Sequence, residues 1–216
     1  MVVNMSKDTG TARRLTAPAR RAQLIEVGRA VFARRGYEAA SVEEIAERAK
    51  VSKPVVYEHF GGKEGLYAVV VDREMERVVA RISEAIASGS PRERLERAAL
   101  AFLEYVRDEP DGFAVLSRDA PVTAADTGMS GLLSEVAERV GAVFAAEFRK
   151  AGYDAKRAPI YAHALVGMVT FVGQWWKEVR KPPVEEVAGH LAALAWMGLR
   201  RLPKQPSRVA DRHPRT

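Results

Sequence analysis

The sequence predicts an all-α protein of about nine helices, and three observations support this fold class. Apolar residues recur at helical spacing in nearly every segment longer than ten residues. Strand-like alternation of apolar and polar residues is absent, and the segments are separated at glycine, proline or capping residues. With 216 residues, of which 47% are apolar and 29% charged, the chain is long enough for one large domain or two small ones.

Capping residues place the starts and ends of the expected helices. The first helix is expected over about 18–35, with Gly36 in the position of a C-terminal cap. Ser41 opens the second helix with capping-box spacing, and Ser52 caps a third helix that ends at Gly61-Gly62. Further helices are expected over about 63–87, 91–108, 113–117, 129–151, 159–179 and 183–202, with a turn at 109–112 and a loop at 120–128.

Composition narrows the classes of function. The chain has no cysteine and only four scattered histidines, so we expect no metal site, and no cofactor or catalytic residue set can be recognised. No apolar run approaches the roughly 20 residues that cross a bilayer, and no signal peptide is visible, so we expect a cytoplasmic protein without a membrane partner. Of the net charge of +6, residues 1–21 carry +4 and residues 203–216 carry +3. Such basic ends suit nucleic acid, but they also occur as plain solubilising tails.

The segment 41–60, SVEEIAERAKVSKPVVYEHF, predicts a helix-turn-helix. Two helices of about eight residues flank a tight turn at Lys50-Val51, a geometry that lets the second helix enter a DNA major groove. Val56 and Phe60 lie four residues apart and are expected to face the first helix of the pair. Polar side chains on the second helix are then available to DNA: Ser52, Lys53, Tyr57 and His59.

This segment carries a family resemblance. The pattern V-S-x-P-x-x-Y-x-H-F followed by G-G-K-E-x-L-Y resembles the DNA-binding domain of TetR-family regulators over about residues 18–70. The resemblance implies a helical homodimer with three N-terminal helices on DNA and about six more in a ligand-binding and dimerisation body. It divides the chain into a disordered basic arm (1–16), a TetR-type helix-turn-helix domain (17–62), a ligand-binding and dimerisation domain (63–202) and a disordered basic tail (203–216).

The same resemblance implies which residues meet the DNA. Ser41, at a helix N-terminus, would bind phosphate, and Pro54 and Val55 would touch thymine methyl groups. Simpler roles stay open for Tyr57 as a core residue and for Lys63 as a solvated helix residue. The expected DNA contacts are Ser41, Ser52, Lys53, Pro54, Val55, Tyr57, His59 and Lys63. The arginines expected before the first helix would either enter the minor groove or form a solvated tail: Arg13, Arg14, Arg20 and Arg21.

The remaining helices hold a surplus of large apolar side chains, which either fill the core or line a ligand channel. The candidate ligand-binding residues are Phe102, Tyr105, Phe113, Leu116, Phe144, Phe148, Phe171 and Trp175. The last helix is apolar on nearly all sides, so one of its faces is expected to meet a second subunit. The expected dimer-interface residues are Leu191, Leu194 and Ala195.

The body also resembles TetR regulators that respond to long-chain acyl-CoA, through L-V-G-M at 165–168 and A-W-M-G-L at 195–199. We therefore expect a repressor that a small hydrophobic effector, such as an acyl-CoA, releases from a palindromic double-stranded DNA operator. A CoA headgroup would need a cation, for which the candidates are Arg118, Lys177 and Arg180. The alternatives are a multidrug-type repressor of an efflux gene and a non-specific architectural DNA-binding protein. An enzyme on a helical scaffold has the least support.

Overall fold

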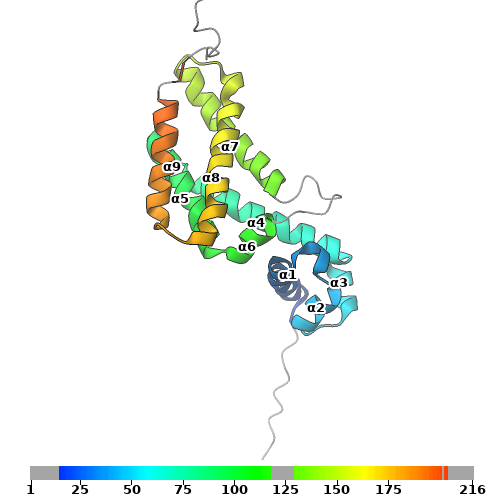
Figure 1. Cartoon of the computed structure of the whole chain (residues 1–216). Helices are drawn as coiled ribbons and strands as arrows, with labels where there is room; N and C mark the ends of the chain where they lie inside the picture. The colour runs from blue at the N-terminus through cyan, green and yellow to red at the C-terminus, as the bar shows by residue number, and fades with distance from the viewer. Residues whose placement is uncertain (1–14, 118–128, 201, 204–216) are drawn as a thin grey trace, which may run out of the picture.

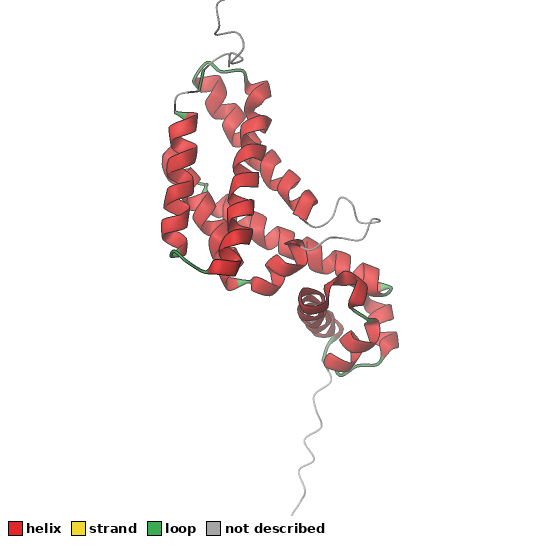
Figure 2. Cartoon of the chain, in the orientation of Figure 1, coloured by secondary structure: helices red, strands yellow, loops and turns green. Residues whose placement is uncertain are grey.

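The structure is a computed structural model that describes residues 15–117, 129–200, 202 and 203, with the side chains of 129–132 excepted. Within these residues the chain is helical and has no strand, as predicted (Figure 2). Most of the expected basic arm and tail, and the expected loop at 120–128, lie outside the described residues. The α-helices are α1 (Ala17–Ala39), α2 (Val42–Arg48), α3 (Lys53–Phe60), α4 (Lys63–Ala85), α5 (Pro91–Asp108), α6 (Pro110–Ser117), α7 (Met129–Lys150), α8 (Ala158–Val179) and α9 (Val184–Leu199).

Helices α1, α2 and α3 form a group at one end of the molecule (Figure 1). Leu24 of α1, Ile45 of α2 and Val56 of α3 are completely buried and make its core. The regular helix ends at Gly36, as predicted, where the backbone takes a positive φ of 75°. After this kink a short helical segment continues to Ala39, and both parts are counted in α1. The two short helices of the predicted helix-turn-helix are therefore braced by a long first helix.

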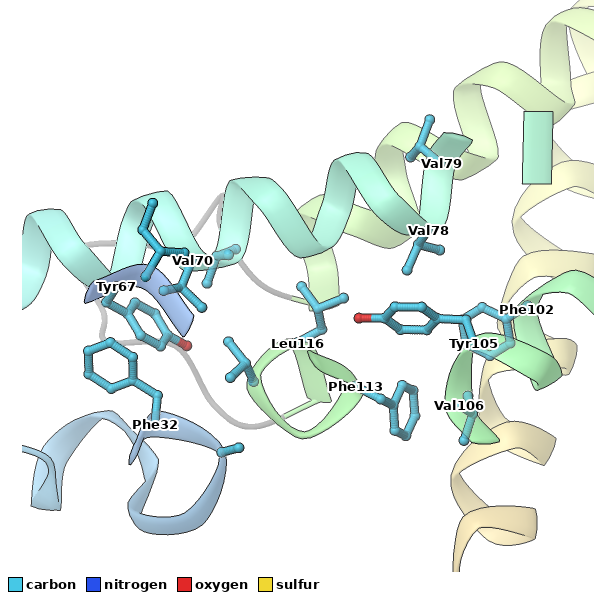
Figure 3. Packing of buried hydrophobic residues seen from close by; sticks show 14 of the residues in the cluster. Phe32, Tyr67, Val70, Val78, Val79, Phe102, Tyr105, Val106, Phe113 and Leu116 are labelled. Carbon is cyan, nitrogen blue, oxygen red and sulfur yellow. The ribbon is translucent and has the colours of Figure 1, made fainter. Parts of the chain in front are cut away.

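Helix α4 connects this group to the body. It packs on α1 as well as on α5 and α6. Near its start, the Tyr67 ring meets the Phe32 ring edge-on at 5.1 Å between centroids, and farther along Val78 is buried toward α5 (Figure 3). The helical stripe predicted for this segment is thus buried along most of its length. A movement of α4 in the body would therefore displace the group formed by α1, α2 and α3.

The expected turn at 109–112 is wrong, because α6 already begins at Pro110. Proline is favoured in the first turn of a helix, where its missing N–H has no partner to lose, and Asp111 suits the positive end of the helix dipole. Gly112 is helical and buried. The cluster that looked like a turn is therefore a helix start, and only Glu109 separates α5 from α6.

The other helices form the body. Ser90 and Glu93 form the capping box predicted at the start of α5. The antiparallel pair α7 and α8 pack closely, and α9 packs on α5. The sequence did not predict the short 3₁₀ helix η2 (Ala155–Arg157), which the Asp154 side chain caps between α7 and α8. This arrangement leaves α4, α5, α7, α8 and α9 around a common interior.

Candidate nucleic-acid interface and effector cavity

Helix α3 presents a polar outer face and an apolar inner face. Val56 is completely buried, and the half-buried Val55 and Phe60 pack against the same core. The residues that point outward are Ser52, Lys53, Pro54, Tyr57 and Glu58. Four of the eight expected DNA contacts therefore have the exposure that a reading helix needs: Ser52, Lys53, Pro54 and Tyr57. Val55 and His59 are half-buried, and the His59 ring lies beside Phe60.

Lys53, at the start of the reading helix, forms an ion pair with Glu43 of α2. Both side chains are more than half exposed, so the pair is accessible to solvent. The hydrogen bond from Lys53 lowers the pKa of Glu43, so this carboxylate stays charged at neutral pH. A DNA phosphate or base would compete with Glu43 for the Lys53 ammonium.

An arginine cluster that the sequence analysis missed surrounds Glu44. Arg34 and Arg35 of α1 and Arg48 of α2 each pair with this one carboxylate. Ser41 accepts a hydrogen bond from the Glu44 N–H at 3.2 Å and caps α2. Three guanidinium groups around one carboxylate leave an excess of positive charge beside the α2 N-terminus, which favours phosphate. The signal in the sequence was the Arg-Arg pair before Gly36, whose partner Glu44 follows about ten residues later on the next helix.

Lys63 has a structural partner that the sequence did not reveal. Its ammonium donates to the carbonyl oxygens of Tyr37, at 3.1 Å, and Glu38, at 3.3 Å, and lies 4.4 Å from the centroid of the Tyr37 ring. Two of its three donors therefore hold the end of α1. The expected contact of Lys63 with phosphate stays a prediction, limited to the remaining donor.

Two of the four arginines expected before the first helix lie elsewhere. Arg20 and Arg21 lie inside α1, not before it, because Thr16 caps this helix and Pro18 stands in its first turn. The Arg21 guanidinium lies 4.9 Å from the centroid of the Phe60 ring, at the end of α3. Arg13 and Arg14 lie outside the described residues.

The body contains an apolar cavity of about 80 Å³ between α4, α5, α7, α8 and α9. Thr170 is the one polar residue among the described residues that line it. Helix α4 contributes Val78 and Ile82, and α5 contributes Phe102. The remaining lining residues are Leu95, Ala98, Ala99, Leu133, Val136, Val140, Leu165, Val166, Met168, Val169, Leu191, Ala192 and Ala195. Such a cavity suits an apolar ligand or the apolar part of one.

Of the eight residues predicted to bind the ligand, only Phe102 lines this cavity. Tyr105, Phe113 and Leu116 are completely buried below it, toward α4 and α6. Phe144 and Phe148 belong instead to an aromatic cluster with Tyr153 and Tyr161, where α7 ends and α8 begins.

The prediction is wrong for Phe171 and Trp175, which are 75% and 51% exposed. They lie one turn apart on the outer side of α8, whereas Val166, Val169 and Thr170 face the cavity. Helix α8 is apolar on both sides, so its sequence contains no amphipathic pattern that could have told the two faces apart.

Of the three residues predicted for the dimer interface, only Leu194 is exposed. Leu191 and Ala195 line the cavity instead. Large apolar side chains are nevertheless exposed on both α8 and α9. We call them together the outer α8–α9 face; they are Ile160, Phe171, Trp175, Val179, Leu194 and Met197. Apolar patches of this kind mark protein–protein interfaces.

The candidate cations for a CoA headgroup lie away from the cavity lining. The Lys177 ammonium lies 5.4 Å from the Phe113 ring centroid, and the Arg180 guanidinium 5.5 Å from that of Trp176. Arg118 lies outside the described residues. Among the described residues, no group of three His, Asp or Glu side chains can hold a metal ion, and no helix is long and apolar enough to cross a membrane.

The fold and the two sites define a helical DNA-binding protein in which one helix, α4, connects a helix-turn-helix to a body with an apolar cavity. Comparison with known families gives the class a name. Residues 24–70 match the bacterial regulatory proteins of the tetR family, and residues 91–198 match the tetracyclin repressor-like C-terminal domain. The chain belongs to the TetR family of DNA-binding transcriptional regulators, and the resemblance stated from the sequence is confirmed.

Individual relatives support this assignment. The chain is 32% identical over 192 residues to the HTH-type transcriptional activator FasR of Mycolicibacterium smegmatis, over 88% of this chain and 87% of FasR. The HTH-type transcriptional repressor KstR of the same organism is 35% identical over 77 residues, which are 35% of this chain and 38% of KstR. A TetR-like transcriptional regulator from Rhodococcus sp. RHA1 superposes with a TM-score of 0.70 at 30% identity, over 87% of this chain and 99% of that one.

Proposed function

We propose that this regulator binds a palindromic operator as a homodimer and that a hydrophobic effector in the body cavity releases it. The observation that carries the proposal is the shared use of α4. The same helix that lines the cavity with Val78 and Ile82 begins at Lys63, and only two glycines separate it from the reading helix. An effector that binds one α4 position better than another therefore shifts the reading helices, as linkage requires.

The chemistry of the cavity favours an acyl chain over a cationic drug. Its described lining is apolar except for Thr170. A multidrug-type sensor would need a buried carboxylate facing its ligand. Glu74 is the acidic residue that is buried in the described chain, but it does not line the cavity and is already bonded to Arg77 and Tyr105. We therefore place long-chain acyl-CoA first among effectors, and a cationic aromatic drug second.

The outer α8–α9 face is the proposed dimer interface. Regulators of this family dimerise, and a palindromic operator requires two reading heads with half-sites about one helical turn apart, or roughly 34–36 Å. Leu194, Phe171 and Trp175 would be removed from water when a second copy packs on this face. We propose repression as the direction of regulation. FasR, which aligns with most of this chain, is a transcriptional activator.

A selection from a random DNA pool tests the DNA-binding part of this proposal. The full-length protein should enrich an inverted repeat, and log K for the enriched DNA should fall with log salt at about −0.9 per phosphate contact. An architectural DNA-binding protein would enrich no sequence.

Native mass spectrometry of the purified protein tests the effector part. A co-purified lipid or acyl-CoA in a dimer would support it. A panel of cationic dyes then distinguishes the alternative, because dyes that displace the enriched DNA while acyl-CoAs do not would point to the multidrug-type repressor.

A further inference from the structure

A buried carboxylate lies where the DNA-binding helices meet the body. Glu74 of α4 is 1% exposed and is surrounded by three side chains from three helices. Its Oε2 accepts a hydrogen bond from the Tyr105 hydroxyl of α5 at 2.8 Å. Its Oε1 accepts one from Arg77 of α4 at 2.6 Å and lies 3.2 Å from Nε of Arg29 in α1. One oxygen thus faces the body, and the other faces the DNA-binding group.

The groups around Glu74 form a closed network. Arg29 also pairs with Glu109, between α5 and α6, and Arg77 also pairs with Glu26 of α1 at 3.3 Å. Burial alone would lower the pKa of Arg29, but the hydrogen bond with Glu109 and the carboxylates around it raise this pKa, so the guanidinium stays charged. Burial and the nearby Glu74 carboxylate raise the pKa of Tyr105 far above its usual value, so its hydroxyl remains a donor.

One contact in this network is poorly aligned. Nε of Arg29 is buried and lies within ion-pair distance of Glu74, yet it makes no hydrogen bond. Its attraction to Glu74 is therefore mainly electrostatic and depends on the distance between α1 and α4. The Tyr105 hydrogen bond, by contrast, is directional.

The network is within one helical turn of the cavity. Phe102, which lines the cavity, and Tyr105 lie three residues apart on α5, and Phe102 contacts Phe113 of α6 edge-on, with centroids 6.0 Å apart (Figure 3). Gly112, which precedes Phe113 in α6, packs directly against Glu74 and Tyr105. A side chain at Gly112 would collide with the Glu74 carboxylate.

We propose that Glu74 is the positioning residue that fixes the DNA-binding helices relative to the body, with Tyr105 as its anchor in the body and Arg29 as its anchor in α1. A ligand that displaces Phe102 moves Tyr105 and Phe113, and so moves the carboxylate to which α1 is bound. The positioning role stands on the contacts alone, and only its link to the cavity rests on the proposed function.

The test measures the relative position of the two reading heads without DNA or effector. The chain contains no cysteine, so a Glu47→Cys substitution on the exposed side of α2 accepts one spin label per subunit. Pulsed electron–electron double resonance on the labelled dimer then gives the distribution of distances between the two reading heads. Tyr105→Phe removes one hydroxyl and leaves the ring in place. Tyr67→Phe is the matched control, since it removes a hydroxyl from another buried ring, which is not among the partners of Glu74.

We expect Tyr105→Phe to broaden the distance distribution and to weaken binding to the enriched DNA about tenfold, while Tyr67→Phe changes neither. A purely structural role would lower the melting temperature and leave the distances as they are. If Tyr105→Phe does not fold, Arg77→Gln at a half-exposed position should broaden the same distribution. Wild-type distances in both folded variants would overturn the proposal. Failure of the wild type to select any DNA would instead refute the proposed function and leave the distance result intact.

Discussion

The ammonium group of Lys63 donates to the carbonyl oxygen of Tyr37, 3.1 Å away, and so ties the first residue of α4 to the end of α1. The Glu38 carbonyl oxygen accepts from the same group. These carbonyls follow the kink at Gly36, where the chain leaves its regular helix. Lys63 therefore stabilises the junction between the first helix and the helix that connects to the body.

Lys63→Met tests this role, since methionine keeps an unbranched apolar side chain and removes the charge. We expect the free energy of unfolding to fall by about 1–2 kcal/mol, as for other hydrogen bonds from charged groups. DNA binding should weaken to a similar degree for all sequences. Lys150→Met is the control and should change neither, because Lys150 is an exposed residue of α7 whose ion pair within the described residues is with Glu147 of the same helix. Unchanged urea denaturation of Lys63→Met would show that the contact contributes nothing.

Lys53 should affect sequence preference more than Lys63 does. Lys53→Ala is expected to change the sequence enriched from a random pool, because its side chain is at the start of the reading helix. Glu43→Gln removes the competing carboxylate and should tighten DNA binding at low salt, with a smaller effect at high salt. An identical enriched sequence for Lys53→Ala would place this lysine outside the base-reading set.

Gly112 and Gly141 should respond oppositely to the same substitution. Gly112→Ala forces a methyl group into the Glu74 carboxylate and should destabilise the protein by about 1–3 kcal/mol. Gly141→Ala on α7 meets only ordinary contact, with the nearest heavy atom 3.7 Å away on Ala162, and should stabilise by about 0.5–1 kcal/mol through helix propensity. Thermal denaturation of both variants decides this, and equal melting temperatures would mean that α6 packs less tightly than described.

Leu194 and Leu191 separate dimerisation from folding. Leu194→Asp places a charge on the outer α8–α9 face and should yield a helical monomer with weak DNA binding. Leu191→Asp buries an unpaired charge beside the cavity and should cost several kcal/mol of stability. Sedimentation and circular dichroism distinguish the two outcomes. A dimeric Leu194→Asp protein that still binds DNA would move the interface elsewhere.

The sequence predicted the helices well where local rules decide them. Ser41 and Ser90 cap the helices that their spacing indicated, and the recognition of 41–60 as a helix-turn-helix is supported by the family match. The turn at 109–112 failed because Pro, Asp and Gly occur both in turns and in first turns of helices. Buried Gly112 is tolerated for a reason that is distant in the sequence, the approach of Glu74.

The sites were predictable only in part. The outward residues of α3 follow from a short amphipathic helix with one buried face. Phe171 and Leu191 were misplaced because α8 and α9 are apolar all round, and their orientation depends on tertiary packing and on a second subunit. The partners of Glu74 could not have been predicted, since Arg29, Glu74 and Tyr105 are separated by more than thirty residues. Glu74 is one of five acidic residues in α4, and its spacing of four from Val70 and from Val78 is the sequence signal for its burial.

A chain-length titration tests the central claim, that a ligand in the cavity controls DNA binding, most directly. Fluorescence anisotropy of the enriched DNA would be followed with C4 to C20 acyl-CoAs for the wild type, for Ala98→Leu, which fills part of the cavity, and for Ala80→Leu on the exposed side of α4 as control. Release should strengthen with each CH₂ by roughly 0.8 kcal/mol until the cavity is full. Ala98→Leu should shift the preferred length downward, and Ala80→Leu should behave as the wild type. Indifference of the wild type to every acyl-CoA, or an unchanged length preference in Ala98→Leu, would contradict the account.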